Sequence, residues 1–138
     1  MLNTKVLKRI AVEYWQEKPV NRPIKVVSLL RGKLERVVGY ITCYKFVAGR
    51  SLKEVEKILG LIPGTLAGGA QVYEFLRLPS ESEFELRGHT QCPAGEKWTP
   101  ESEYPAGLGA SQWELKQDAE IPSRLAAIIP RDGILKVL

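Results

Sequence analysis

A long loop in the second half of the chain contains the residue types best suited to contact a ligand. It covers residues 93–113 and reads PAGEKWTPESEYPAGLGASQW. Gly107 and Gly109 permit a close approach of the main chain to a ligand, and Gln112 offers both a hydrogen-bond donor and an acceptor. The loop also has planar aromatic surfaces, at Trp98, Tyr104 and Trp113. Because long loops in small domains are often functional, we expect ligand contact here, with a packed structural loop as the alternative.

The single histidine and one of the two cysteines lie just before this loop. His89 and Cys92 are three residues apart in GHTQC, so a Cys/His nucleophile pair is conceivable. In an extended segment, however, side chains three apart point to opposite faces, and we therefore favour a polar loop histidine. Cys43 and Cys92 lack the spacing of metal ligands, so no metal site is expected, and a disulfide between them stays open.

Three glutamates alternate in the segment SESEFEL: Glu81, Glu83 and Glu85. Alternation places side chains on one face of a strand, where a pair of carboxylates resembling that of a glycosidase is possible. The solvent face of a half-buried strand explains the same pattern, because Phe84 and Leu86 supply the matching apolar face. We favour the second interpretation.

Composition predicts a single soluble domain with an uneven charge distribution. The chain has 138 residues and a net charge of +4. Residues 1–50 contain eleven Lys and Arg against three Glu, whereas the remaining residues carry nine basic and thirteen acidic groups. A basic third is typical of proteins that contact nucleic acid, a membrane surface, a phosphate-bearing ligand or an acidic partner protein, although a solvated face explains it equally.

No apolar run is long enough to span a bilayer, and the first residues lack the features of a signal peptide. We therefore expect no membrane span. A soluble chain of this kind is either cytoplasmic or one part of a larger secreted protein, and the sequence leaves this choice open.

The pattern of apolar residues predicts an α+β fold. Residues 4–17 have the period of an amphipathic helix, and Ser51, Glu54 and Gly60 supply the capping box and C-terminal stop of a second helix over residues 51–60. The segments expected as strands are 24–30, 34–47, 71–78, 83–91 and 112–116. Residues 121–129 fit a short helix or a strand, and PRDG at 130–133 fits a turn. The sum is one domain over residues 1–138, with a mostly antiparallel sheet of about six strands and one or two helices: a basic helix and hairpin over 1–50, then a helix, strands and the long loop over 51–138.

A series of short motifs from Arg50 onward occurs in the order found in one toxin family. The motifs are GRSL at 49–52, VYEFLRLP at 72–79, FELRG at 84–88, YPAGLGASQWEL at 104–115 and DGIL at 132–135. In this order the chain resembles the tuberculosis-necrotizing-toxin-like NAD glycohydrolases, bacterial effector domains with an ADP-ribosyltransferase-like fold. The resemblance covers about two-thirds of the chain and leaves residues 1–45 without a counterpart.

The resemblance implies a hydrolase that consumes NAD as its substrate and needs no other cofactor. Arg50 would hold the pyrophosphate, and Gln112 would position the ribose or the attacking water. Tyr73 or Trp113 would stack on a ring, and His89 would add a polar contact. Gly107 and Gly109 would line the dinucleotide site. A toxin domain of this kind would also have a neutralising immunity protein as a partner.

A different function is compatible with the same sequence. In this alternative the chain is a non-catalytic binding module, and its basic N-terminal third contacts nucleic acid or an acidic partner protein. Aromatic residues within that third, at Tyr14, Trp15, Tyr40 and Tyr44, would then stack on bases.

Overall fold

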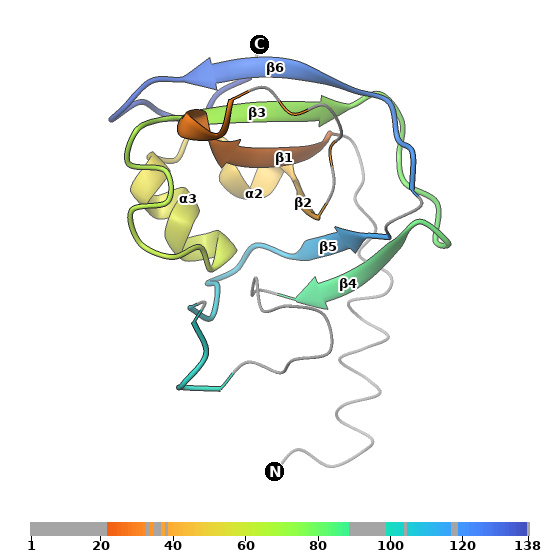
Figure 1. The fold of residues 1–138 in the computed structure, drawn as a ribbon, viewed down its shortest axis with the longest axis horizontal. Coiled ribbons are helices and arrows are strands. Elements are labelled where there is room, and N and C mark those ends of the chain that lie inside the picture. Colours follow the sequence, from red (N-terminus) through yellow and green to blue (C-terminus); the bar gives the residue numbers. More distant parts are fainter. Residues whose placement is uncertain are drawn as a thin grey trace.

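In a computed structural model of the chain, six strands form one antiparallel sheet with two helices against it (Figure 1). The structure describes residues 22–32, 34, 37, 39–88, 99–103, 105–116 and 119–137. The strands lie in the order β4-β5-β2-β1-β3-β6. Their bounds are β1 Pro23–Ser28, β2 Tyr40–Cys43, β3 Ala70–Phe75, β4 Phe84–Gly88, β5 Gln112–Leu115 and β6 Ser123–Ile129. The expected α+β class and the number of strands are confirmed.

The helix predicted after Arg50 forms as expected. Helix α3 covers Leu52–Leu59, the Ser51 side chain accepts the main-chain N–H of Glu54, and Gly60 takes a left-handed conformation with φ of 68°. The Glu54 carboxylate accepts the N–H of Ser51 in return, which completes the capping box. The apolar stripe of α3 is buried against the sheet, so local capping and tertiary packing favour the same segment.

The two N-terminal strand predictions were too long. The first strand ends at Ser28, whose hydroxyl accepts the N–H of Leu30 and begins a 3-10 helix, η1, over Leu29–Arg31. The second prediction covered residues 34–47, but β2 holds only Tyr40–Cys43. The following residues form a helical turn, α2, over Tyr44–Val47, because the N–H of Ala48 bonds to the Tyr44 carbonyl and Gly49 then turns the chain with φ of 74°.

Residues 121–129, for which helix and strand were both considered, form strand β6. It pairs with β3 from Phe75↔Ser123 to Ala70↔Ile129. An ion pair between Arg124 and Glu74 links the two strands at 2.9 Å. Beyond β6, residues 131–132 form the expected turn, in which Asp132 has a φ of 59°.

The other boundaries differ by a few residues. The strand expected over 71–78 ends at Phe75, although the N–H of Leu76 still bonds to the Pro122 carbonyl in the register of the β3–β6 pair. The strand expected over 83–91 begins at Phe84 and is seen as far as Gly88. Its last residues and the helix expected over 4–17 lie outside the described residues.

Two apolar cores lie against different parts of the sheet. One joins α3 to β1, β3 and β6 through residues such as Ile24, Val55 and Val72. The other joins β2, β4 and β5 around Trp113. Phe46 of α2 packs against both cores. Each three-stranded half of the sheet thus packs mainly on one core, and Phe75 at the end of β3 joins the second.

The two halves meet where β1 lies beside β2. The pairs between these strands are Pro23↔Cys43 and Ile24↔Thr42, whereas β1 pairs with β3 along five positions from Ile24 to Ser28. Beyond Ile24, β1 therefore continues along β3 while β2 continues along β5. This separation of neighbouring strands creates the site described next.

Candidate functional site

A cleft of about 440 Å³ opens where β1 and β2 separate. We call it the β1–β2 cleft. Strand residues 24–28 and 40–42 form two of its sides, and the end of α3 at Leu59 and the connector after it, with residues 61, 62, 65 and 66, cover it. Its polar lining comes from Lys25, Ser28, Arg31, Tyr40, Thr42, Thr65 and Gln112. This volume lies within the range of roughly 300–1,000 Å³ that is usual for small-molecule sites.

Lys25 projects into the gap between the two strands. Its ammonium group donates to the Tyr40 carbonyl at 3.3 Å, so the side chain takes the place of the missing ladder bonds. Burial, and after it the nearby positive charge of Arg31, lower the pKa of Lys25 from 10.5 to about 8. None of the ion pairs between described residues includes Lys25. No carboxylate in the described part of the chain therefore pairs with its charge.

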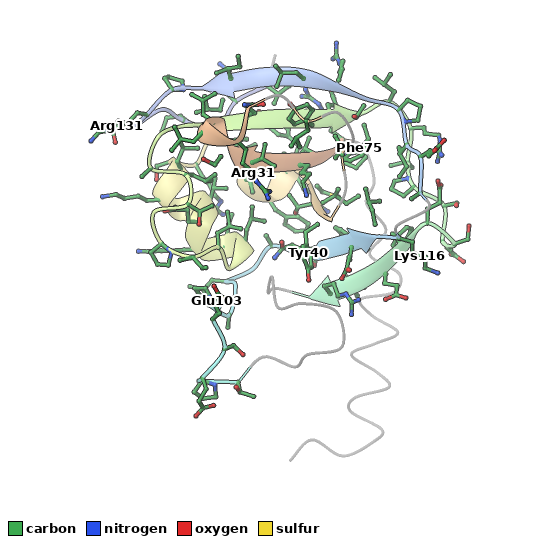
Figure 2. The ribbon with its side chains drawn as sticks, viewed as in Figure 1. Arg31, Tyr40, Phe75, Glu103, Lys116 and Arg131 are labelled. Carbon is green, nitrogen blue, oxygen red and sulfur yellow. The ribbon has the colours of Figure 1, made fainter. Side chains whose placement is uncertain are left out.

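Arg31 is the second cation of the cleft. It is the last residue of η1, and its side chain is exposed. Figure 2 shows Arg31 and Tyr40 near the middle of the molecule. Like Lys25, Arg31 forms no ion pair with any carboxylate that the structure describes. Two cations thus face one cleft without a described counter-ion, and such an arrangement favours an anion.

Gln112 forms part of the base of the cleft. It opens β5 opposite Thr42 and is 1% exposed. Its Nε2 donates to the Leu59 carbonyl at 2.7 Å, which ties the end of α3 to the sheet. The hydroxyl of Thr42 donates to the Ser111 carbonyl and fixes the neighbouring main chain. The carboxamide is therefore held rigidly at the wall of the cleft.

Arg50, the predicted partner of Gln112, does not line the β1–β2 cleft. It follows α2, where its Nε donates to the Phe46 carbonyl and its guanidinium lies 3.6 Å from Glu54. The structure thus brings Lys25 and Arg31, not Arg50, into the same cleft as Gln112. The predicted pyrophosphate role of Arg50 stays a prediction.

The two aromatic residues expected to stack on a ligand are buried. Trp113 is 1% exposed within the core of β2, β4 and β5. Tyr73 is 4% exposed; its hydroxyl donates to Gln71 and accepts the N–H of Leu34. Stacking on a ligand stays a prediction for both, and it would require these rings to become accessible.

The glycines of the long loop flank a residue that is bonded to α3, and neither of them lines the cleft. The N–H of Leu108, between Gly107 and Gly109, bonds to the Lys57 carbonyl at 3.2 Å. Gly109 has a φ of 104° and open space around it. His89 and Cys92 lie outside the described residues, as do Trp98 and Tyr104.

The alternating glutamates do not share one strand face. Glu81 and Glu83 lie in the turn before β4, and only Glu85 lies in the strand. Glu83 accepts two hydrogen bonds from Arg77, at 2.7 and 2.9 Å. Phe84 is buried and Glu85 exposed, as expected of a half-buried strand.

The described cations of the basic N-terminal third have different surroundings. Arg22 pairs with Glu74 at 2.7 Å and lies over the Tyr44 ring. Lys25 and Arg31 line the cleft. Most of the remaining basic residues of this third lie outside the described part of the chain.

Sequence reasoning missed Lys25 and Arg31 as site residues. One signal was present: Lys25 interrupts the apolar run of PIKVVS, where a charged residue needs a local reason. The apolar pattern of these two segments does not predict the separation of β1 from β2. The separation arises because β1 pairs mainly with β3 and β2 with β5.

Comparison with protein-family models, curated proteins and solved structures gives no significant match to this chain. Among the described residues, no helix has the length and apolar character needed to cross a bilayer.

Proposed function

We propose that this chain binds a dinucleotide in the β1–β2 cleft and hydrolyses the nicotinamide–ribose bond of NAD. The observation that carries the proposal is the meeting of Lys25, Arg31 and Gln112 in one cleft, without a described carboxylate to neutralise the two cations. The anionic ligand class follows from this charge. The choice of reaction rests on the motif order that resembles NAD glycohydrolases.

The proposed reaction makes modest demands on a protein. The bond between the ribose carbon and the ring nitrogen breaks, and its electron pair neutralises the cationic nicotinamide ring. A water oxygen bonds to the ribose carbon and releases a proton, which gives ADP-ribose and nicotinamide. Because the leaving group departs neutral, no strong general acid is needed, and catalysis depends mainly on orientation of the substrate and on electrostatics.

The two cations have complementary roles in this scheme. The planar guanidinium of Arg31 forms bidentate hydrogen bonds to a phosphate, and the Lys25 ammonium acts as a point charge deeper in the cleft. An anion beside Lys25 would also stabilise its protonated form. The carboxamide of Gln112 is 1% exposed and bonded to Leu59, so to orient the ribose at the base of the cleft it would have to become accessible, as Tyr73 and Trp113 would to stack.

The direct test measures release of nicotinamide from NAD by the purified chain. Lys25→Met and Arg31→Gln should each slow the reaction by about ten- to a hundredfold, the effect of losing a hydrogen bond to a charged group. Lys45→Met, at an exposed lysine of α2, is the matched control and should leave the rate unchanged. Arg50→Ala shows whether the pyrophosphate contact lies there instead.

A binding measurement separates the site from the reaction. Calorimetric titration with inorganic pyrophosphate should show binding that both cleft variants weaken and Lys45→Met does not. Pyrophosphate binding without nicotinamide release would keep the anion site but remove the hydrolase. Absence of both would overturn the proposal. Binding of nucleic acid with a steep dependence on salt would instead favour the binding-module alternative.

A further inference from the structure

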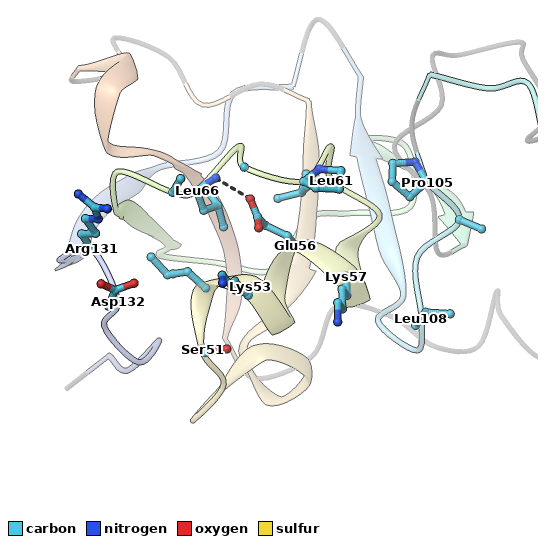
Figure 3. Close-up of a pocket in the computed structure, with 15 residues that line it drawn as sticks. Ser51, Lys53, Glu56, Lys57, Leu61, Leu66, Pro105, Leu108, Arg131 and Asp132 are labelled. Atoms are coloured by element: carbon cyan, nitrogen blue, oxygen red, sulfur yellow. Dashed lines mark hydrogen bonds between the residues drawn. The ribbon is translucent and has the colours of Figure 1, made fainter.

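A second hollow of about 820 Å³ lies along α3, outside the β1–β2 cleft. We call it the α3 groove. Figure 3 shows Arg131 and Asp132 at one end, Pro105 and Leu108 at the other, and Glu56 with Leu66 between them. The connector after α3 forms the wall that the groove shares with the cleft, because Leu61 and Leu66 line both.

The groove has an apolar lining. Leu52, Leu61, Pro63, Leu66, Pro105 and Leu108 contribute to it. Leu108 is 67% exposed, although it sits in a loop that is bonded to the end of α3. A large apolar side chain at the rim of an apolar hollow is typical of an interaction site.

The rim of the groove is positively charged. Lys53 and Lys57, one turn apart on α3, are exposed, as is Arg131 after β6. These three cations form no ion pair within the described part of the chain. Of the two acidic residues that line the groove, Glu56 is buried and accepts the N–H of Leu66 at 2.8 Å, and Asp132 is exposed beside Arg131. The exposed charge around the apolar lining is therefore mainly positive.

We propose that the α3 groove docks an acidic amphipathic segment of a partner protein. Apolar side chains of that segment would fill the hollow beside Leu61 and Leu108, and its carboxylates would contact Lys53, Lys57 and Arg131. A flat membrane surface fits a concave hollow poorly. Among the described residues, the lining holds aliphatic side chains and no aromatic ring on which a nucleic-acid base could stack. This inference goes beyond the proposed hydrolase and does not depend on it.

The test selects peptides from a random library displayed on phage against the full chain. The selection is repeated against a double variant, Lys53→Gln with Lys57→Gln, which removes two rim charges from exposed positions. We expect the wild-type protein to enrich peptides with both acidic and apolar residues, and the double variant to lose them. The most enriched peptide is then titrated by calorimetry.

Two matched pairs of variants locate the binding site. The affinity of the peptide should fall by at least about tenfold in the double variant and in Leu108→Ser. It should be unchanged in Lys116→Gln and Leu125→Ser, whose side chains are exposed and do not line the groove. Circular dichroism and thermal melting confirm that each variant is folded.

Three outcomes would overturn the inference. These are enrichment of neutral or basic peptides, equal affinity of the selected peptide for wild-type and groove variants, and no enrichment over the bare support. If anionic vesicles or single-stranded DNA bind the groove and the selected peptides do not, the partner class is wrong. None of these measurements uses NAD, so failure here is distinguishable from failure of the proposed hydrolase.

Discussion

The buried carboxylate of Glu56 accepts the main-chain N–H of Leu66, ten residues further along the chain, at 2.8 Å. This hydrogen bond holds the connector after α3 against the helix. The connector is the wall between the β1–β2 cleft and the α3 groove, so one side chain helps to shape both hollows. This hydrogen bond explains why a glutamate, Glu56, occupies the buried face of α3.

Glu56→Ala should destabilise the protein by about 1–3 kcal/mol, because the buried N–H of Leu66 loses its acceptor. Glu56→Gln keeps an oxygen that can accept this N–H, so it should lower the free energy of unfolding by less than Glu56→Ala does. Urea denaturation measures both changes, with Lys53→Ala on the exposed face of α3 as the control. Equal stability of Glu56→Ala and the control would show that the connector is held by other contacts.

Lys25 should make stability depend on alkaline pH. Its pKa is lowered from 10.5 to about 8 in the folded protein by burial, so the unfolded chain binds more protons between these values. Stability should therefore rise between pH 8 and 10.5, by up to about 3 kcal/mol relative to Lys25→Met, which has no charge to bury. Urea denaturation of both proteins at pH 7 and 10 measures the difference. Parallel pH profiles would contradict the burial of this ammonium group.

Glu83 should contribute to stability against acid. Hydrogen bonds from Arg77, and then from the Ser80 main chain, lower its pKa from 4.5 to about 2. Its contribution is complete above pH 4.5 and is lost as the pH falls from there toward 2. Because solvent screens this pair, we expect about 1 kcal/mol or less. Glu83→Gln should flatten the acid limb of the stability profile by this amount, while Glu85→Gln, at an exposed strand position, should change it less.

Two glycines with similar backbone angles should respond differently to alanine. Gly69 has a φ of 110°, and an added Cβ would lie 2.7 Å from the Ile129 carbonyl oxygen. Gly64 has a φ of 93° but nothing within 4 Å of the same position. Both substitutions cost about 1–2 kcal/mol in backbone strain, and Gly69→Ala should cost more because β6 must shift. Thermal melting of the two variants ranks them, and a larger loss for Gly64→Ala would contradict the close approach.

Local signals in the sequence were sufficient for α3 and for the existence of most strands. Ser51, Glu54 and Gly60 mark the helix by side-chain chemistry that acts within a few residues. Helix α2 was not predictable in this way, because YKFV has strand-forming residues and its first N–H is bonded to the carbonyl of Arg22, which is distant in sequence. Tertiary contact here overrides local preference.

The candidate site was predictable only in part. Gln112 was singled out by its place at the start of a strand, and it does line a cleft. Arg50 was chosen from the motif order, whereas the cations of the cleft are Lys25 and Arg31. Lys25, Arg31 and Gln112 share one cleft because β1 separates from β2. The residue pattern within either strand does not predict this separation.

The uneven pairing of β1 with β2 has a mechanical consequence. Main-chain bonds cross this junction at the Pro23 and Cys43 end, where the N–H of Tyr44 also bonds to Arg22, and the described strands have no further paired positions toward Ser28. A small rotation about that bonded end would widen the mouth of the cleft, and Phe46 and Phe75, which link the two halves of the sheet, would resist it. Such an opening would let a substrate larger than the resting cavity enter.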